Sequence, residues 1–448
     1  MQAQTLTANG MGPMEFAAPR FGSKKDPSKA PFFWLCAFYV VYCARPEDWI
    51  PGLHYLPLAR ITAVLALWGL FNSWGRTKRK PKDLPVESRY LLAIIVLLFV
   101  GGILSPIWPG GAISHAMDFS KVYVAWVLTF LLVTDFERLK RIIFIQASSV
   151  AVIALISIVK GHDKPRLNGA LDGMYSNPND LAFCIVLALP FCMAFMISSK
   201  SFFAKMLWIV GMLFMLTALL LTASRAGMID LACAGTVALW HFGVRGKRFY
   251  LIAGALIVGA GLMLVAGGKM KERLESLSSG VSQEDVDGSY EARKYLMEQA
   301  VRGIEEYPVF GVGVNNFINY SGDWHEVHMA YLEMAVEGGI PVFILYVLFF
   351  RRGFRNLKRL RKMKNLDPNQ RLFIGALHSS LVGFVVGALF APVAYQFFSY
   401  FAVAFTSVLL KILEENKQNS TGAAPSPTPS LREVYVNYAG TGAVAPVR

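Results

Sequence analysis

The stretch MLWIVGMLFMLTALLLT, residues 206–222, contains no charged side chain and is followed directly by Ala223-Ser-Arg-Ala-Gly227. A helix needs about 20 mainly apolar residues to cross the hydrocarbon core of a bilayer, because its backbone groups must bond within the segment. Residues 206–222 therefore predict a membrane-spanning helix. Arg225 would then lie at a membrane boundary, where a polar or ionisable group is costly and usually marks a pathway or a site.

The rest of the chain repeats this pattern of long apolar runs. Of its 448 residues, 54% are hydrophobic and 17% are charged, whereas a soluble domain carries roughly 25% charged residues. We predict an all-α polytopic integral membrane protein with about twelve transmembrane helices. The expected spans are 31–44, 58–74, 90–107, 121–134, 142–159, 181–199, 206–222, 228–243, 249–267, 327–349, 372–390 and 393–412.

Basic residues predict the orientation of this bundle. Every second loop is rich in Lys and Arg, namely 76–80, 138–141, 245–248 and 351–371. Because cytoplasmic loops carry an excess of Lys and Arg, both termini are expected in the cytoplasm. The net charge of +14 follows from this bias and gives no reason to expect a nucleic acid partner.

The segment 268–326 is the one long loop on the opposite, periplasmic side. Helical spacing runs from Tyr290 to Tyr307, and Pro308 and Gly311-Val-Gly313 break it. The side chains expected to share one face of this helix are Tyr295, Leu296, Ala300 and Ile304. Long loops in compact proteins are usually functional or disordered, and the helical pattern favours function.

The chain therefore divides into three parts. We expect a cytoplasmic N-terminal segment at 1–30, a membrane domain at 31–414, and a disordered cytoplasmic tail at 415–448 that is rich in Ser, Thr, Pro, Gly and Ala. Residues 1–30 lack the apolar region of a cleavable signal peptide. No zinc spacing or disulfide is expected among the five cysteines, which all fall within predicted spans: Cys36, Cys43, Cys184, Cys192 and Cys233.

Three arginines on the outer side are candidate ligands for phosphate oxygens, which a guanidinium group matches with paired hydrogen bonds. Arg225 is the strongest, although an arginine at a boundary also reaches headgroups by snorkelling. Arg293 opens the loop helix, where an ion pair with Glu291 is the alternative. Arg166 is a weaker third candidate.

His328 lies at the start of the tenth span, and histidine is the side chain best suited to proton transfer near neutral pH. A hydrogen-bonded histidine at a helix start is the alternative, and residue chemistry alone does not choose between His328 and the nearby His325. The turn Asn177-Pro-Asn-Asp180 is expected to cap the sixth span, to support a site, or both. Asp285 and Asp287 have a metal-like spacing, but their setting favours a solvated loop, so no metal is expected.

The order and spacing of these motifs resemble the O-antigen ligase and polymerase superfamily, whose members are polytopic transferases of lipid-linked glycans. The resemblance covers roughly residues 160–345. It rests on Asn177-Pro-Asn-Asp-Leu-Ala182, Ser224-Arg-Ala-Gly227, Arg293, Tyr307-Pro-Val-Phe-Gly-Val-Gly313, Asn316-Phe317, His328, Tyr331-Leu332, Glu337 and Gly339.

The resemblance implies an enzyme without a cofactor that works at the outer face of the bacterial cytoplasmic (inner) membrane. The donor would be a glycan on undecaprenyl diphosphate, held by Arg225 and Arg293. The residue matching the family's base, which activates the acceptor hydroxyl, is His328 rather than His325. Possible supporting residues are Arg166, Asn177, Asn179, Asp180 and Glu337. The family usually has Asn where this chain has Met329, so one hydrogen-bonding partner is missing.

Several functions remain open at this point. The reaction implied by the resemblance is inverting transfer of a glycan to an acceptor hydroxyl of lipid A-core, a glycan or a protein, as in lipopolysaccharide and polysaccharide biosynthesis of the cell envelope. Another lipid-linked glycan as acceptor would make the protein an O-antigen or exopolysaccharide polymerase, and a protein hydroxyl would make it a protein O-oligosaccharyltransferase. A membrane transporter is the alternative from another class, because such proteins also place polar groups within spans.

Overall fold

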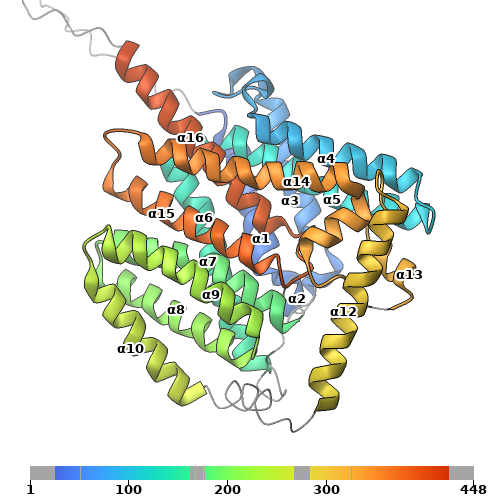
Figure 1. The fold of residues 1–448 in the computed structure, drawn as a ribbon. Coiled ribbons are helices and arrows are strands. Elements are labelled where there is room, and N and C mark those ends of the chain that lie inside the picture. The colour runs from blue at the N-terminus through green and yellow to red at the C-terminus, as the bar shows by residue number, and fades with distance from the viewer. Residues whose placement is uncertain are drawn as a thin grey trace, which may run out of the picture.

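The computed structural model describes residues 26–50, 52–161, 167, 175, 177–266, 283–323 and 325–422, and every regular element among them is a helix (Figure 1). The first half contains α1 (Lys29–Ala44), α2 (Pro46–Trp49), η1 (Leu53–Tyr55), α3 (Leu58–Asn72), η2 (Trp74–Arg76), η3 (Pro81–Asp83), α4 (Val86–Ile103), α5 (Pro109–Leu132), α6 (Phe136–Gly161) and α7 (Pro178–Ser198). The second half contains α8 (Phe202–Leu221), α9 (Arg225–Leu239), the π-helical η5 (Trp240–Val244), α10 (Phe249–Ala266), α12 (Gln283–Glu306), α13 (Phe317–Ser321), α14 (Ala330–Lys362), α15 (Pro368–Gly387) and α16 (Phe397–Gly422).

The protein is a polytopic helical membrane protein, and each of the predicted spans falls on a helix. Eight helices of the described chain are long and apolar enough to cross a membrane: α4, α6, α7, α8, α9 with η5, α14, α15 and α16. Helices α1, α3 and α10 are apolar but shorter. Helix α5 is not among the eight, and Asp118 and Lys121 interrupt its first half. The number of twelve spans therefore stays a prediction.

Helix α7 lies at the centre of the bundle. It packs against α6, α8, α9 and α15, and most of its side chains are buried, from Asp180 to Phe195. A helix that is apolar on all sides is expected in such a position. Helix α8 is apolar as well but exposes large side chains such as Phe202 and Leu207, as expected of a helix that faces lipid. The burial pattern thus separates the core of the bundle from its surface.

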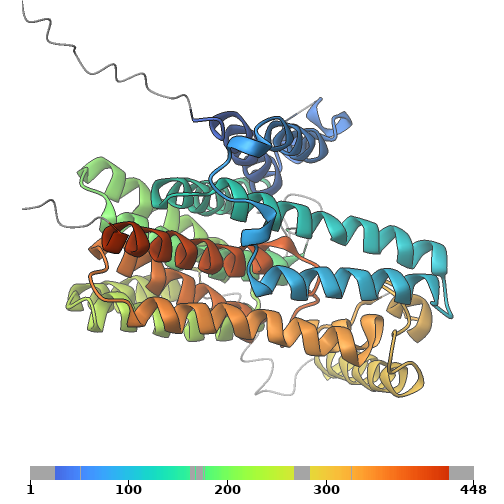
Figure 2. The same cartoon turned by 90° about the horizontal axis from the view of Figure 1, so that it is seen from above.

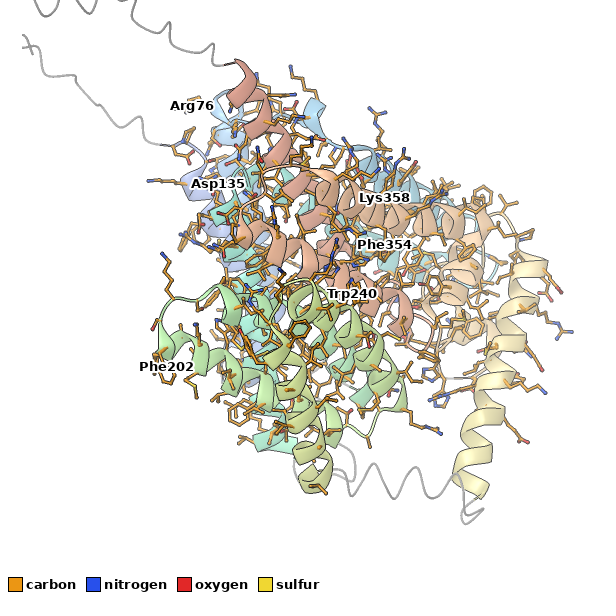
Figure 3. The ribbon with its side chains drawn as sticks, turned by 60° about the vertical axis from the view of Figure 1, so that its left-hand side comes forward. Arg76, Asp135, Phe202, Trp240, Phe354 and Lys358 are labelled. Carbon is orange, nitrogen blue, oxygen red and sulfur yellow. The ribbon has the colours of Figure 1, made fainter. Side chains whose placement is uncertain are left out.

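One end of the bundle carries the basic segments. The buried guanidinium of Arg79 donates to the backbone oxygens of Phe130 and Val133 at 2.9 and 2.8 Å. At the same end, Arg138 bonds Asp26 and Arg359 bonds Glu414. Figure 3 shows Arg76, Asp135 and Phe202 on the side of the molecule that lies away from α12. The loops that the sequence assigns to the cytoplasm therefore gather together.

Helix α12 lies across the other end of the bundle, beside the ends of α14, α4 and α5 (Figures 1 and 2). Its buried side chains Leu296 and Ala300 form an apolar cluster with Phe317 of α13 and Val336 of α14. The helix expected within 268–326 is therefore present, with Leu296, Ala300 and the half-buried Ile304 on one face. Tyr295 differs from the expectation, because its side chain is 44% exposed.

The last helix extends into the predicted tail. Helix α16 continues from Phe397 to Gly422, so the first residues of the range 415–448 are helical. The carboxylate of Glu415 pairs with Lys78 at 2.9 Å and with Arg79 at 3.1 Å. These ion pairs hold this part of α16 against the bundle. Residues 423–448 lie outside the described chain, as do residues 1–25 of the N-terminal segment.

Candidate functional site

The turn before α7 is an N-terminal cap. Asn177 Oδ1 accepts hydrogen bonds from the backbone N–H groups of Asn179 and Asp180 at 2.8 and 3.0 Å. The Nδ2 group of Asn177 donates to Asp180 Oδ2 at 2.7 Å. These bonds pair N–H groups that have no partner within the helix. The capping role predicted for Asn177 is confirmed, and it fixes the side chain of Asp180 beside the cap.

Ser224 caps α9 and joins it to this turn. Its Oγ accepts from the N–H of Gly227 at 3.1 Å and donates to Asn179 Oδ1 at 2.7 Å. A Cβ atom on Gly227 would lie 2.7 Å from Cβ of Ala182 in α7, so only glycine allows the two helices to approach this closely. Arg225 is consequently held at the first position of α9, next to the cap of α7.

Arg293 lies on α12, three and seven residues before the buried Leu296 and Ala300, and so on the same side of the helix as these two anchors. The Arg293 side chain is exposed. Partial desolvation by the surrounding protein and the nearby charge of Arg225 lower the pKa of Arg293. Two guanidinium groups from distant parts of the chain therefore act on each other at this end of the bundle. No carboxylate is paired with either of them among the described residues, although an ion pair between Arg293 and Glu291 was the alternative reading.

His328 lies in the segment that leads into α14. Burial lowers its pKa to about 4, and the charges of Arg293 and His325 act in the same direction. The imidazole is therefore neutral at physiological pH and able to accept a proton. Arg225, Arg293 and His328 come from α9, α12 and the segment before α14, and the charge of Arg225 acts on Arg293 as that of Arg293 acts on His328.

His325 has a different environment. Its Nδ1 atom lies 2.7 Å from Asp323 Oδ1, and its backbone N–H donates to the same oxygen at 3.1 Å. The ring centroids of His325 and His328 are 6.5 Å apart. The contact between Asp323 and His325 was not predicted, although the spacing Asp-x-His is visible in the sequence.

The glycine-rich motif after α12 is a backbone junction with α14. The N–H groups of Val312 and Gly313 donate to the carbonyls of Val336 and Glu337 at 2.9 and 3.0 Å. Gly311 has φ +67°, and a Cβ atom there would lie 2.4 Å from the backbone carbon of Glu337. Gly339 in turn interrupts α14 with φ +80°. These glycines hold the loop against α14 and so set where His328 lies.

Asn316 fastens the same loop to the turn between α4 and α5. Its Nδ2 group donates to Ser105 Oγ at 2.8 Å and to the Trp108 backbone oxygen at 3.1 Å. Ser105 Oγ donates to the carbonyl of Val312 at 2.6 Å. Ser105 was not among the predicted site residues, because a single hydroxyl directly after an apolar run does not stand out in the sequence.

Several carboxylates lie near the site. Glu337 is 5% exposed, and its carboxylate faces the backbone of Asn315 and Phe317, so it supports the loop from within. Glu333 accepts from the N–H of Ala394 at 3.2 Å. Glu326, two residues before His328, has an exposed side chain, and partial desolvation by the surrounding protein raises its pKa. Glu333 and Glu326 were not among the predicted site residues.

Two further predictions concern Arg166 and the pair Asp285 and Asp287. Arg166 lies outside the described residues. Asp285 and Asp287 fall within α12, although a loop was expected. Within the described ranges, no group of three or more His, Cys, Asp or Glu side chains is placed to hold a metal ion.

Comparison with known proteins agrees with the motifs. The family model described as O-Antigen ligase matches residues 210–347. A search of curated proteins found no match. The family match contains Arg225, Arg293 and His328, and it confirms the predicted resemblance to the O-antigen ligase superfamily.

Proposed function

We propose that the protein transfers a glycan from undecaprenyl diphosphate to an acceptor hydroxyl, because the O-antigen ligase family model matches residues 210–347. The proposed site faces the periplasm at the outer surface of the bacterial inner membrane, with both termini in the cytoplasm. Arg225 and Arg293 bind the diphosphate of the donor, and His328 is the general base.

The convergence of three side chains carries this proposal. The charge of Arg225 acts on Arg293, and the charge of Arg293 acts on His328. These residues come from elements separated by up to about a hundred positions in the chain, since Arg225 opens α9 and His328 precedes α14. Two cations beside a neutral imidazole are complementary to an anionic leaving group and a hydroxyl nucleophile.

The reaction follows from this arrangement. The acceptor oxygen attacks the anomeric carbon of the donor sugar while His328 takes the hydroxyl proton. The bond between that carbon and the diphosphate oxygen breaks, and its electron pair leaves with the diphosphate. Attack from the face opposite the leaving group inverts the anomeric centre. The two guanidinium groups stabilise the negative charge that develops on the diphosphate, so the proposed mechanism needs no metal ion.

The other members of the superfamily use the same chemistry with another acceptor. A second lipid-linked glycan would make this protein an O-antigen or exopolysaccharide polymerase, and a protein hydroxyl would make it an O-oligosaccharyltransferase. A transporter would need polar groups along a path through the bundle. The described residues do include a half-buried pair between η5 and α15, where His241 Nε2 lies 2.9 Å from His378 Nδ1. The placement of Arg225 and His328 together at one end favours the enzyme.

Glycan analysis of a deletion strain tests the proposal. Lipid-linked, lipid A-linked and protein-linked glycans are measured in cells without the protein and in cells that carry the wild-type chain or Arg225→Ala. We expect the lipid-linked glycan to accumulate and one acceptor-linked product to disappear in the first and third strains. Unchanged levels of all three products in the deletion strain would contradict the proposal.

A further inference from the structure

A second histidine is held beside His328. Asp323 Oδ1 accepts from the backbone N–H of His325 at 3.1 Å and lies 2.7 Å from its Nδ1 atom. A carboxylate at Nδ1 orients the ring and fixes the tautomer with the hydrogen on that nitrogen, which leaves Nε2 as the basic atom. When His325 is protonated, the two side chains form an ion pair.

The surroundings of the two imidazoles differ in the sign of the nearest charge. The guanidinium of Arg293 acts on His328 and disfavours its protonated form. The carboxylate of Asp323 adjoins His325. The two neighbouring rings are therefore held beside groups of opposite charge, a guanidinium at His328 and a carboxylate at His325. Other charged or titratable groups at this end include Arg225 at the start of α9, Asp180 in the first turn of α7, Glu326 between the two histidines, Glu333 and Glu337 in α14, and Lys294, Glu298, Arg302 and Glu305 along α12.

The separation of the rings fits a transfer through one water molecule. His241 and His378, whose ring nitrogens are 2.9 Å apart, have centroids 5.2 Å apart. The centroids of His325 and His328 are 6.5 Å apart, which is too wide for the same direct bond. A bridging water restores a continuous path. The His325 side chain is 36% exposed, so the path ends at solvent.

We propose that His325, oriented by Asp323, relays the acceptor proton from His328 to solvent. This inference rests on the proposed transfer reaction. In the balanced step, the acceptor hydroxyl loses its proton to His328 as its oxygen bonds the anomeric carbon. The electron pair of the broken bond leaves on the diphosphate. The proton then passes through water to Nε2 of His325 and from there to bulk solvent, which returns His328 to its neutral form.

Rescue by imidazole tests the relay. Full-length protein is placed in vesicles made from membranes of the deletion strain, which contain the native donor and acceptor, and the rate of glycan transfer is measured at constant pH and ionic strength. We expect His325→Ala to slow transfer about 10-fold, at the low end for a proton-transfer group. Its rate should rise with imidazole concentration, because a diffusing base replaces the missing one. The wild-type rate should not change with imidazole.

Two further variants keep the outcomes distinct. Asp323→Asn keeps the size of the side chain and should also make the rate depend on imidazole. His115→Gln is the matched control; this outer-end histidine lies 3.1 Å from Asn315 Nδ2, and its rate should not respond to imidazole. If His325→Ala is slow and its transfer rate does not rise with imidazole, the relay is contradicted. The relay is also contradicted if His325→Ala transfers glycan at the wild-type rate. In both cases the proposed function remains supported. Absence of transfer by the wild-type protein would overturn the proposed function and the relay together.

Discussion

Ser224 Oγ donates a hydrogen bond to Asn179 Oδ1 at 2.7 Å, although Ser224 caps α9 and Asn179 lies in the first turn of α7. The same Oγ caps α9 through the N–H of Gly227, and Asn177 caps α7 through Asn179 and Asp180. The two caps are thus one hydrogen-bonded unit. Because Arg225 directly follows Ser224, this unit determines where its guanidinium lies.

Breaking this unit should displace Arg225 without removing it. We predict that Asn179→Ala and Ser224→Ala lower the rate of glycan transfer about 10-fold, and that Ser224→Ala also costs about 1 kcal/mol of stability through the lost cap. Transfer rates and thermal unfolding of the purified variants measure the two effects. Thr236→Ala on the same α9 is the control, because its hydroxyl bonds only the exposed turn before it. Wild-type rates in both variants would show that the link between the caps does not position Arg225.

The arginines themselves should be more sensitive. Arg225→Ala and Arg293→Ala are predicted to reduce transfer by about 100-fold or more, the usual effect of losing one preorganised donor to a developing negative charge. Lysine at either position should restore only part of the rate, because an ammonium cannot form the planar pair of bonds. Transfer by the wild-type protein should survive EDTA.

Arg302→Ala is the control for these variants, because this exposed residue of α12 is paired with Glu306 at 3.7 Å on the helix surface. Its rate should equal that of the wild-type protein. A complete loss of wild-type activity in EDTA, reversed by a divalent ion, would contradict the metal-free mechanism.

The pH dependence of the glycan transfer rate should depend on the positive charge of Arg293 beside His328. Only the neutral imidazole accepts a proton, and the pKa of His328 is lowered to about 4 by burial and by the charges of Arg293 and His325. The rate should therefore stay level from neutral pH down to about 4 and then fall. Removing the positive charge in Arg293→Gln lowers the cost of protonation, so the pKa rises and the fall begins at a higher pH.

The residual rate of Arg293→Gln, followed as a function of pH, measures this shift. His328→Ala should lose this dependence altogether, together with about 100-fold to 10,000-fold in rate. Arg302→Gln should keep the wild-type profile. An identical profile in Arg293→Gln and the wild-type protein would mean that Arg293 does not act on the base.

The elements of this fold were largely predictable, because each apolar run has the length and the uninterrupted hydrophobicity of a helix. The segment 206–222, for example, corresponds to α8 at Phe202–Leu221. The start of α5 was placed too late at residue 121, since Asp118 and Lys121 lower the hydrophobicity of its first half. Charged side chains do not end a helix, but they lower the local hydrophobicity from which a membrane span is predicted.

The contacts that build the site were much less predictable. The motifs containing Arg225, Arg293 and His328 were visible because they are polar residues next to apolar runs. The hydrogen bonds between Asn316 and Ser105 and between His325 and Asp323 were not predicted, because nothing in the local sequence pattern marks these residues as partners. Hydrogen bonds between turns depend on how the helices pack, and periodicity in one segment carries no information about a partner in another.

The orientation in the membrane is tested by cysteine labelling. Glu305 lies on α12 and Lys358 near the end of α14, and both side chains are exposed. The alternation of basic loops predicts that the first is outside and the second in the cytoplasm. Single cysteines at these positions are introduced into a chain whose five native cysteines are replaced. In intact spheroplasts, a membrane-impermeant maleimide should label Glu305→Cys and not Lys358→Cys, and both should react after the membrane is permeabilised. Position 358 is preferable to the neighbouring Asn356, whose side chain is only 2% exposed. The reverse pattern would place Arg225, Arg293 and His328 on the cytoplasmic side, where a periplasmic acceptor could not reach them.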